Sequence, residues 1–548
     1  MQTSPPRPVN PWAVTFSVML ATFMEILDTT VVNVSIPHIA GNLGADINEG
    51  TWVVTSYLVS NAIILPMAGW LARYMGRRRL LLLCVAGFTG TSLCCGLSTS
   101  LEALIICRVL QGVTGGGLQP LAQAILLETF PPQKHGTAMA AFGLGVIIAP
   151  IVGPALGGWI TDNYSWRWIF YLNIPVGILS LFLMNQFVFD PPYIRRGKGR
   201  ADLWGIGFLA LGFGTLQVIL DTGQREDWFS SLSIRILTAL CISGLALFIV
   251  RELTTRSPVV DLRALADRTF STSVFLVSML GFVLYASLVL LPIYVQTLLG
   301  YPAFQAGLAV SPRGLGALAT TPLCGYLANK VDPRKLLVFG MLLGGITMFD
   351  LSGLNLNAGY WDIFWPQVFQ GVALSFLFIP IMAAGVSHIS KEKMGNATSI
   401  FNLMRNIGGS FGIALMTTFL TRRNQFHQNH LVSNITIYDS ETRQMLQGMV
   451  AWFQFQGADA YTASQRALAA LYGLVQRHAA MLSFVEAFWI MGVLFLAMVP
   501  FVVFLRKPLR QVAPQPSKAV TEKAGGPADL RGTEREPVEE PEPLVHSI

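Results

Sequence analysis

Long apolar runs separated by short polar loops recur along most of this chain. Each run is close to the roughly 20 residues that an α-helix needs to cross a bilayer. The runs occupy residues 12–37, 51–71, 80–98, 104–128, 137–160, 166–189, 203–221, 232–250, 270–298, 303–328, 336–354, 362–387, 395–420 and 480–505. The pattern therefore predicts an all-α polytopic membrane protein with 14 transmembrane helices.

The composition supports this interpretation. Of the 548 residues, 53% are hydrophobic and 12% are charged, whereas a soluble protein carries about 25% charged residues. The first run, 12–37, is longer than a signal peptide and contains Glu25 and Asp28, so we expect it to remain as the first span. The six cysteines lie in apolar runs and the seven histidines are scattered. We therefore expect no disulfide framework, no metal site and no cofactor.

The distribution of basic residues predicts the orientation. An even number of spans leaves both termini on one side, and Lys and Arg cluster in the loops on that side. The clearest clusters are Arg73, Arg77, Arg78 and Arg79, and then Arg195, Arg196, Lys198 and Arg200. The positive-inside rule then predicts that the N-terminus (1–11) and the polar tail (506–548) are cytoplasmic. In this interpretation the net charge of +7 reflects the orientation of the chain in the membrane and does not indicate nucleic-acid binding. The composition of the tail predicts disorder.

An internal repeat predicts the architecture. The matching segments are Gly69–Leu80 with Gly325–Leu336, Arg108–Val113 with Gln367–Val372, and Gly136 and Gly153 with Gly395 and Gly412. We therefore expect two six-helix bundles, 12–189 and 270–505, with residues 203–250 as two inserted helices at the side that line little of the central cavity. Parallel halves of this kind enclose a substrate site and alternate its access between the two membrane faces.

Several motifs are typical of one transporter family. They are Leu27–Pro37, Gly69–Arg79, Leu104–Gly116, Ala149–Gly158, Trp166–Gly177 and Leu220–Phe229. Together they resemble the major facilitator superfamily, specifically its fourteen-span drug:proton antiporter family and the EmrB-type multidrug exporters. The resemblance implies the major facilitator fold and proton-driven export, and it covers residues 12–505. In the loop motif, Arg73 stands where the general family pattern has Asp.

Ionisable residues within the spans are candidates for proton coupling, because charges at membrane depth are costly and rare. Glu25 and Asp28 share one helix face, so their proton affinities are raised and coupled in a desolvated cleft. Arg108 does not deprotonate but modulates a nearby carboxylate, and Arg405 also resembles a family position. For each residue the alternative is a structural hydrogen bond or ion pair.

The resemblance also assigns residues to gating. Pro150, Gly153, Pro154, Gly157 and Gly158 match the antiporter motif, and Gly69, Arg73, Gly76, Arg77 and Arg78 belong to the gating loop. Small residues every fourth position let helices approach closely, and the prolines bend the helix. A tight contact of this helix between the two halves would seal the pore against protons. The alternative is ordinary helix packing within the membrane.

The sequence predicts a transporter rather than an enzyme. It contains no phosphate-binding loop, nucleophile elbow or His-Glu-x-x-His motif. We expect a secondary antiporter of the bacterial inner membrane that uses the proton as its coupling ion and exports lipophilic drugs or toxic compounds. Two alternatives stay open: a dedicated exporter of a metabolite such as an antibiotic, siderophore or fatty acid, and a membrane sensor without transport.

The longest predicted loop, 421–479, is expected on the periplasmic side. Its stretches Glu441–Phe455 and Thr462–Gln476 have the mixed composition of amphipathic helices. The family resemblance implies a periplasmic adaptor (a membrane fusion protein) and an outer-membrane channel that continue the export route as a tripartite efflux system. The alternative is a lid that packs on the transporter itself.

Overall fold

The computed structural model describes residues 10–190, 202–255, 258–436 and 438–505, and all regular secondary structure in these ranges is helical. The predicted disordered tail 506–548 and the basic cluster at 195–200 lie outside the described residues, as does most of the N-terminal segment 1–11. The prediction of an all-helical protein is confirmed.

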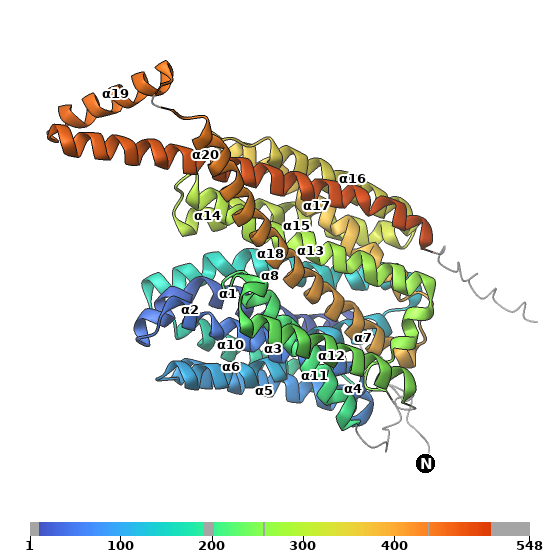
Figure 1. The fold of residues 1–548 in the computed structure, drawn as a ribbon. Helices are drawn as coiled ribbons and strands as arrows, with labels where there is room; N and C mark the ends of the chain where they lie inside the picture. Colours follow the sequence, from blue (N-terminus) through green and yellow to red (C-terminus); the bar gives the residue numbers. More distant parts are fainter. Residues whose placement is uncertain (1–9, 191–201, 256–257, 437, 506–548) are drawn as a thin grey trace, which may run out of the picture. The chain divides into compact units, whose positions relative to one another are not determined.

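Residues 11–187 contain six spans, which pack together as one bundle (Figure 1). Several spans are built from consecutive helices, because glycine or proline interrupts them. The helices are α1 (Pro11–Asn42), α3 (Trp52–Ile64) continuing through η1 (Leu65–Met67) into α4 (Ala68–Met75), α5 (Arg77–Leu97), α6 (Leu101–Gly115) with α7 (Leu118–Thr129), α8 (His135–Asn163), and α9 (Trp168–Tyr171) with α10 (Asn173–Phe187). The short α2 (Ile47–Gly50) connects α1 to α3.

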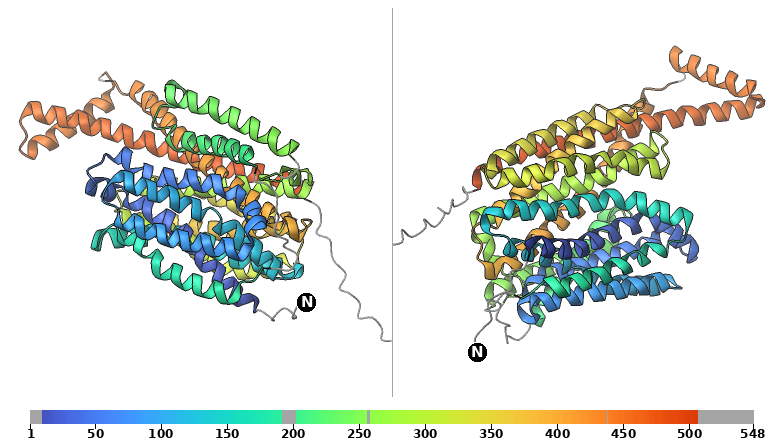
Figure 2. Two further views of the ribbon diagram at one scale, coloured as in Figure 1. Left: turned by 90° about the horizontal axis from the view of Figure 1, so that it is seen from below. Right: turned by 180° about the vertical axis from the view of Figure 1, so that it is seen from behind.

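The second bundle has the same construction. Its helices are α13 (Arg268–Thr297), α14 (Ala303–Val310) with α15 (Pro312–Ala328), α16 (Pro333–Ser352), α17 (Tyr360–Gly385), α18 (Met394–Ser433) and α20 (Ala460–Ala497). Seen from behind, the two bundles lie one above the other, with α8 along the boundary (Figure 2). The division into two six-helix bundles agrees with the internal repeat.

Twelve helices of the described residues are long and apolar enough to cross a membrane. The two remaining predicted spans, 303–328 and 395–420, correspond to α14 with α15 and to the first part of α18. The helix α15 has only 17 residues, and α18 has a polar composition, yet both pack within the second bundle against α17 and α13. With these two included, the architecture matches the predicted fourteen-span arrangement.

The inserted helices α11 (Leu203–Thr222) and α12 (Leu232–Thr254) pack against each other. α11 also contacts α3 of the first bundle and α18 of the second. Gln217 on α11 accepts a hydrogen bond from Ser410 of α18 at 3.1 Å, and the Trp228 indole donates to Thr418 at 2.9 Å. The inserted pair therefore lies at the side of the bundles, as expected, and bridges them.

The segment 421–479, predicted as a loop with amphipathic stretches, is largely helical, and the stretch Glu441–Phe455 lies within α19 (Ser440–Phe455). Residues up to Ser433 continue α18, which has 40 residues, and α20 begins at Ala460 rather than near 480. α19 and the first part of α20 project beyond the other helices (Figure 1). Arg423 donates to Glu486 at 2.5 and 2.6 Å, which joins the bases of the two extensions. Thus a helical hairpin capped by α19 replaces most of the expected loop.

The two bundles meet through two pairs of glycines. A Cβ on Gly69 would lie 2.7 Å from the backbone nitrogen of Asn396, next to Gly395, and a Cβ on Gly136 would lie 2.8 Å from the carbonyl oxygen of Gly325. The Gly69 amide donates to Ser399 at 3.1 Å across the boundary. Because the internal repeat relates Gly69 to Gly325 and Gly136 to Gly395, the two contacts are pseudo-symmetric copies of one contact.

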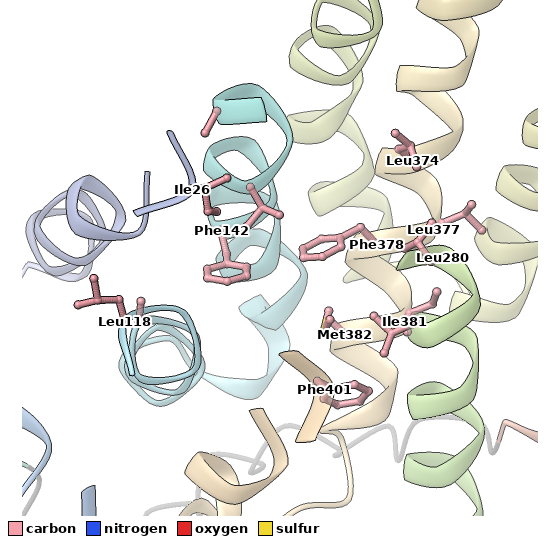
Figure 3. Packing of buried hydrophobic residues seen from close by; sticks show 14 of the residues in the cluster. Ile26, Leu118, Phe142, Leu280, Leu374, Leu377, Phe378, Ile381, Met382 and Phe401 are labelled. Carbon is pink, nitrogen blue, oxygen red and sulfur yellow. The ribbon is translucent and has the colours of Figure 1, made fainter. Parts of the chain in front are cut away.

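Apolar side chains continue this boundary toward the middle of the molecule. Phe142 of α8 stacks on Phe378 of α17, with ring centroids 6.1 Å apart, and Figure 3 shows the two rings facing each other across the space between the bundles. Further along α8, the Ile151 side chain packs beside Gly314 of α15. The α8 face toward the second bundle is therefore apolar over most of its length.

Gly153 and Gly157 of the antiporter motif contact α1 of their own bundle, whereas a seal between the halves would require contact with the second bundle. A Cβ on Gly153 would overlap Thr30, and one on Gly157 would lie 2.9 Å from Val31. Both contacts are with α1, in the same bundle. The expected seal between halves is therefore not made by these two glycines, because the face of α8 that meets the second bundle carries Phe142 and Ile151 instead.

The glycine contact predicts a specific sensitivity to substitution. Gly69→Ala should loosen the boundary, because the added methyl group would collide with rigid backbone around Asn396. A cysteine at Thr398, whose hydroxyl donates to the Pro120 carbonyl across the boundary at 3.0 Å, should then react several-fold faster with a water-soluble maleimide. The background should lack Cys94 and Cys107, the two cysteines that are not buried.

The matched control is Gly90→Ala, since a Cβ at Gly90 meets nothing within 4 Å. That variant should label like the parent protein. Equal labelling of the Gly69 and Gly90 variants would contradict a close glycine contact between the bundles.

Candidate proton-coupling site

Asp28 lies in the middle of the first bundle with its side chain fully removed from solvent. Its Oδ2 accepts a hydrogen bond from Arg108 Nη1 at 2.6 Å. Its Oδ1 accepts from Asn173 Nδ2 at 2.6 Å and from Gln111 Nε2 at 3.3 Å. Both carboxylate oxygens are therefore satisfied by donors from α6 and α10.

Arg108 is equally buried, and its guanidinium contacts residues of α1, α3, α6 and α9. Nε donates to the Val53 carbonyl at 3.0 Å and Nη1 also donates to Gln111 at 2.8 Å, whereas Nη2 has no hydrogen-bond partner. The Tyr57 ring lies 4.4 Å from the guanidinium carbon, a distance at which the ring face attracts a cation. Breaking a buried pair of this kind by removing one partner costs about 3–5 kcal/mol.

Glu25 occupies a second polar cluster one turn earlier on α1. Its Oε2 accepts from Gln119 Nε2 at 2.6 Å, and its Oε1 accepts from the Tyr57 hydroxyl at 3.1 Å and from Asn61 at 3.3 Å. All of its partners are neutral. Tyr57 therefore touches both carboxylate clusters, since its ring packs on Arg108 while its hydroxyl binds Glu25.

A polar connection crosses from this cluster to the second bundle. Arg405 of α18, 1% exposed, donates through Nη2 to Gln119 Oε1, and the same Gln119 donates to Glu25. Its Nε and Nη1 have no hydrogen-bond partner. A second crossing lies nearby, where Asn402 donates to Gln123 at 2.6 Å. The sequence-predicted residues Glu25 and Arg405 are thus brought together through one glutamine, whereas Asp28 and Arg108 pair directly.

The gating-loop residues lie outside these clusters, from the start of α4 (Gly69) to the start of α5 (Arg77 and Arg78). Gly76 has φ +91°, which a residue with a side chain rarely adopts. Arg77 is buried and forms an ion pair with Glu128 of α7, and the Arg78 backbone amide donates to Asp190 at 2.8 Å. Arg73, at the unusual family position, is exposed. Arg77 and Arg78 are therefore held within their own bundle, whereas Gly69 contacts α18 of the second bundle.

Sequence reasoning missed the neutral partners of the carboxylates. Tyr57, Asn61, Gln119 and Asn173 complete the two clusters. Each is a polar residue inside an otherwise apolar run, which is a usable signal. Their pairing with one carboxylate or the other depends on helix packing and is not visible in the sequence.

Comparison with known proteins identifies the family. The model of the family described as Major Facilitator Superfamily matches residues 18–413. The chain belongs to the major facilitator superfamily. The "Multidrug export protein EmrB" of Escherichia coli strain K12 is 36% identical over 499 residues, which cover 90% of this chain and 95% of that protein. The "Fatty acid resistance protein FarB" of Neisseria gonorrhoeae is 36% identical over 497 residues, which cover 90% and 96%.

Solved structures of the superfamily share the fold. A double-tryptophan mutant of XylE superposes with a TM-score of 0.60 at 15% identity, and covers 91% of this chain and 96% of that one. The human organic anion transporter MFSD10 (TETRAN) gives 0.59 at 12% identity, and covers 91% and 100%. These likenesses concern the fold alone. The family match and the EmrB relative identify a multi-pass membrane transporter of the multidrug-exporter type rather than an enzyme.

The Asp28–Arg108 pair of this superfamily member predicts non-additive effects on stability. Arg108→Gln should lower the Tm, because it leaves the Asp28 charge buried without its ion-pair partner. The double variant Asp28→Asn, Arg108→Gln should recover part of that loss, since neither buried charge remains. Thermal unfolding of the purified proteins in one detergent measures both. A double variant less stable than each single variant would contradict a direct pair.

Proposed function

We propose that this chain is a proton-driven antiporter that exports lipophilic drugs or toxic compounds across the bacterial inner membrane. The single observation that carries the proposal is the fully buried ion pair between Asp28 and Arg108. A carboxylate held in this way exchanges its arginine for a proton when the helices rearrange, whereas Arg108 keeps its charge throughout. The relatives named as multidrug exporters support the choice of cargo.

The proposed coupling step begins at Asp28. When a proton binds there, the carboxyl group loses its charge and the attraction to Arg108 is lost, although the hydrogen bonds from Asn173 and Gln111 leave the helix in position. Arg108 then shifts on the Tyr57 ring. Because Tyr57 also donates to Glu25, the change at one carboxylate reaches the other.

Glu25 connects this step to the movement of the bundles. Its partner Gln119 is bound by Arg405 of the second bundle, so separation of the bundles at this depth breaks that connection. In the proposed topology both termini and the gating loop are cytoplasmic, and the glycine contacts at Gly69 and Gly136 close the cytoplasmic end. An inward-moving proton supplies about 2.3 kcal/mol per 100 mV of membrane potential, which biases the exchange toward export.

A dedicated metabolite exporter is the second candidate. One relative is named a fatty acid resistance protein, and export of a fatty acid would use the same coupling residues. A non-transporting sensor would have no need of the buried Asp28–Arg108 pair or of polar groups that bridge the bundles. Substrate-dependent proton flux in liposomes separates the transporters from the sensor, because binding without flux would indicate the sensor.

We expect Asp28→Asn to abolish proton-coupled efflux while the protein remains inserted and folded. The amide has the shape of the carboxylate but cannot bind and release a proton. The measurement is substrate-dependent proton movement into proteoliposomes, followed with an internal pH dye. Asp350→Asn is the matched control for the same change of carboxylate to amide, because Asp350 is exposed on α16 and belongs to neither cluster, and it should retain a pH-dependent rate. Wild-type pH dependence in the Asp28→Asn variant would contradict the coupling role.

We further propose that α19 and the projecting first part of α20 bind a periplasmic adaptor, which connects to an outer-membrane channel. Phe455 is 91% exposed and Trp452 is 55% exposed, although both are large apolar residues. Exposed aromatic groups on a projecting element are typical of a protein-binding surface. The alternative is a lid that closes over the transporter itself.

Deleting residues 439–458 and inserting a short Gly/Ser link should remove this surface, because the deletion takes out α19 and leaves α20 and its ion pair with α18. We expect transport in liposomes to survive, whereas co-purification of the adaptor and resistance in cells should be lost. Replacing only Trp452 and Phe455 with Ser gives a smaller change of the same kind. Unchanged co-purification in both variants would contradict the adaptor role.

A further inference from the structure

The boundary between the two bundles has two lateral edges, and they are closed in different ways. At one edge α8 packs directly against α14 and α15 of the second bundle. At the other edge α18 packs against η1, α4 and α7 of the first bundle, and the Gly69–Asn396 contact belongs to this group. These elements lie toward the end of the bundle that is cytoplasmic in the proposed topology. Nearer the outer end, α3 and α18 both pack against the inserted helix α11.

A small apolar cluster marks the depth at which α11 enters this second edge. The first bundle contributes Leu65 of η1, and the second contributes Leu403 and Ile407 of α18. These three side chains are at most 8% exposed. Phe213 and Leu216 of α11 pack against them. An apolar contact between the two bundles is therefore completed by side chains of the inserted helix.

Polar contacts continue the closure from this cluster toward the outer end of α11. Gln217 is 7% exposed and accepts a hydrogen bond from Ser410 of α18 at 3.1 Å. One turn later on α11, Asp221 accepts a hydrogen bond from Thr55 of α3. Polar groups at membrane depth need partners within the protein, because lipid offers none. The two contacts therefore favour one fixed position of α11, between α3 and α18.

The turn after α11 places one more side chain against α18 at the expense of backbone strain. Asp227 and Trp228 have φ of 52° and 51°, which residues with side chains rarely adopt. The Trp228 ring packs beside Gly223, where a Cβ would lie 2.8 Å from it, and Nε1 of the ring donates to Thr418 at 2.9 Å. Strain of this kind persists only where the surrounding contacts hold it. The outer end of the inserted pair is therefore held to the second bundle.

The opposite face of the inserted pair is exposed and apolar. α11 and α12 approach each other closely at two glycines, since a Cβ on Gly244 would lie 2.7 Å from the backbone nitrogen of Gly212. Ile242 and Val250 of α12 are large apolar residues that are 64% and 60% exposed, as expected of a helix that faces lipid. The pair thus has lipid on one side and the boundary between the bundles on the other.

Closure of this edge determines where a lipophilic cargo can go. A compound that prefers hydrocarbon to water would return to the bilayer through any opening of the outer half that faces lipid. Such an opening would cancel the export step, because the bilayer equilibrates the compound with the cytoplasm. An exporter of such compounds therefore needs an outer opening that faces water and lateral edges that stay closed.

We propose that α11 closes the outer half of the edge between α3 and α18 against lipid, so that a lipophilic cargo leaves toward water and does not return to the bilayer. This inference rests on the proposed export function and assigns a task to the inserted pair. Phe213, Leu216 and Gln217 lie on one face of α11, because they are three and four residues apart, and all three contact α18 or its apolar cluster. α11 therefore follows α18 when the bundles move.

The test measures how accessible the apolar cluster is to lipid. A nitroxide is attached after the substitution Ile407→Cys to full-length protein that lacks Cys94 and Cys107, and the protein is reconstituted in a bilayer. Molecular oxygen concentrates in hydrocarbon whereas a nickel chelate remains in water, so their effects on EPR saturation distinguish the two environments. The parent protein should give low accessibility to both. Phe213→Ala combined with Leu216→Ala should raise the oxygen accessibility several-fold, because acyl chains enter the space that these side chains occupied.

Leu240→Ala combined with Ile242→Ala is the matched control, because it removes two apolar side chains from exposed positions of α12. It should leave the nitroxide at position 407 as in the parent. A nitroxide attached after Leu415→Cys, at a position of α18 that is 48% exposed, gives the reference value for a lipid-facing site. Phe213→Ala alone is a milder change, which should give a smaller rise and replaces the double variant if that variant does not fold.

Three results would overturn the proposal. In the first, the parent nitroxide at position 407 is as accessible to oxygen as the one at position 415. In the second, the oxygen accessibility is unchanged in the folded Phe213→Ala variants. In the third, accessibility to the nickel chelate rises in place of accessibility to oxygen, which would show that this edge borders water.

Transport of the lipophilic dye rhodamine 6G in proteoliposomes separates this inference from the proposed function. The double variant should keep dye-dependent proton flux, whereas net accumulation of the dye in the lumen should fall several-fold because dye returns to the bilayer. Parent-like accumulation despite increased oxygen accessibility would overturn the role in cargo release. A parent protein that excludes lipid at position 407 yet shows no proton flux with any compound would instead contradict the antiporter and leave the closure by α11 standing.

Discussion

The need to neutralise charge away from water governs the interior of this transporter. Three arginines, Arg108, Arg313 and Arg405, are among the largest fully buried side chains, and each must find its compensation inside a low-dielectric bundle. Arg108 has it in a direct contact with Asp28. Arg405 has only an indirect one, through Gln119 to Glu25, and Arg313 has none in the described chain. The three arginines therefore differ in how far their charge is compensated, and the parts of the interior that hold them have different tasks.

The directly paired site and the indirectly paired site also differ in their relation to the boundary between the bundles. Asp28 and Arg108 belong to one bundle, so their contact survives a relative movement of the two bundles. The Gln119–Arg405 contact crosses the boundary, so it forms only where the bundles approach each other. Tyr57 contacts both clusters. The Asp28–Arg108 pair inside one bundle is therefore connected, through the Tyr57 side chain and Glu25, to the Gln119–Arg405 contact between the bundles.

The inserted helices and the α18–α20 hairpin lie outside the two bundles and are also linked to the boundary between them. α11 is bound to α18 through Ser410 and to α3 through the hydrogen bond from Thr55 to Asp221, so any rocking of the bundles must tilt the inserted pair or break one set of contacts. The α18–α20 hairpin continues helices of the second bundle without a break. Movement of that bundle is thus transmitted directly to α19, where the exposed aromatic residues lie.

The sequence by itself determined the membrane character, the helical spans and the division into two related bundles, because apolar length and internal repetition are local properties of the chain. It also singled out Glu25, Asp28, Arg108 and Arg405, since charges inside apolar runs are conspicuous. Only the tertiary structure decided which carboxylate meets which arginine, because that depends on how separate helices pack. For the same reason it assigned Gly153 to a contact with α1 rather than with the other bundle. It also turned the expected loop 421–479 into a hairpin, because the amphipathic stretch 462–476 continues into the last span as a single helix.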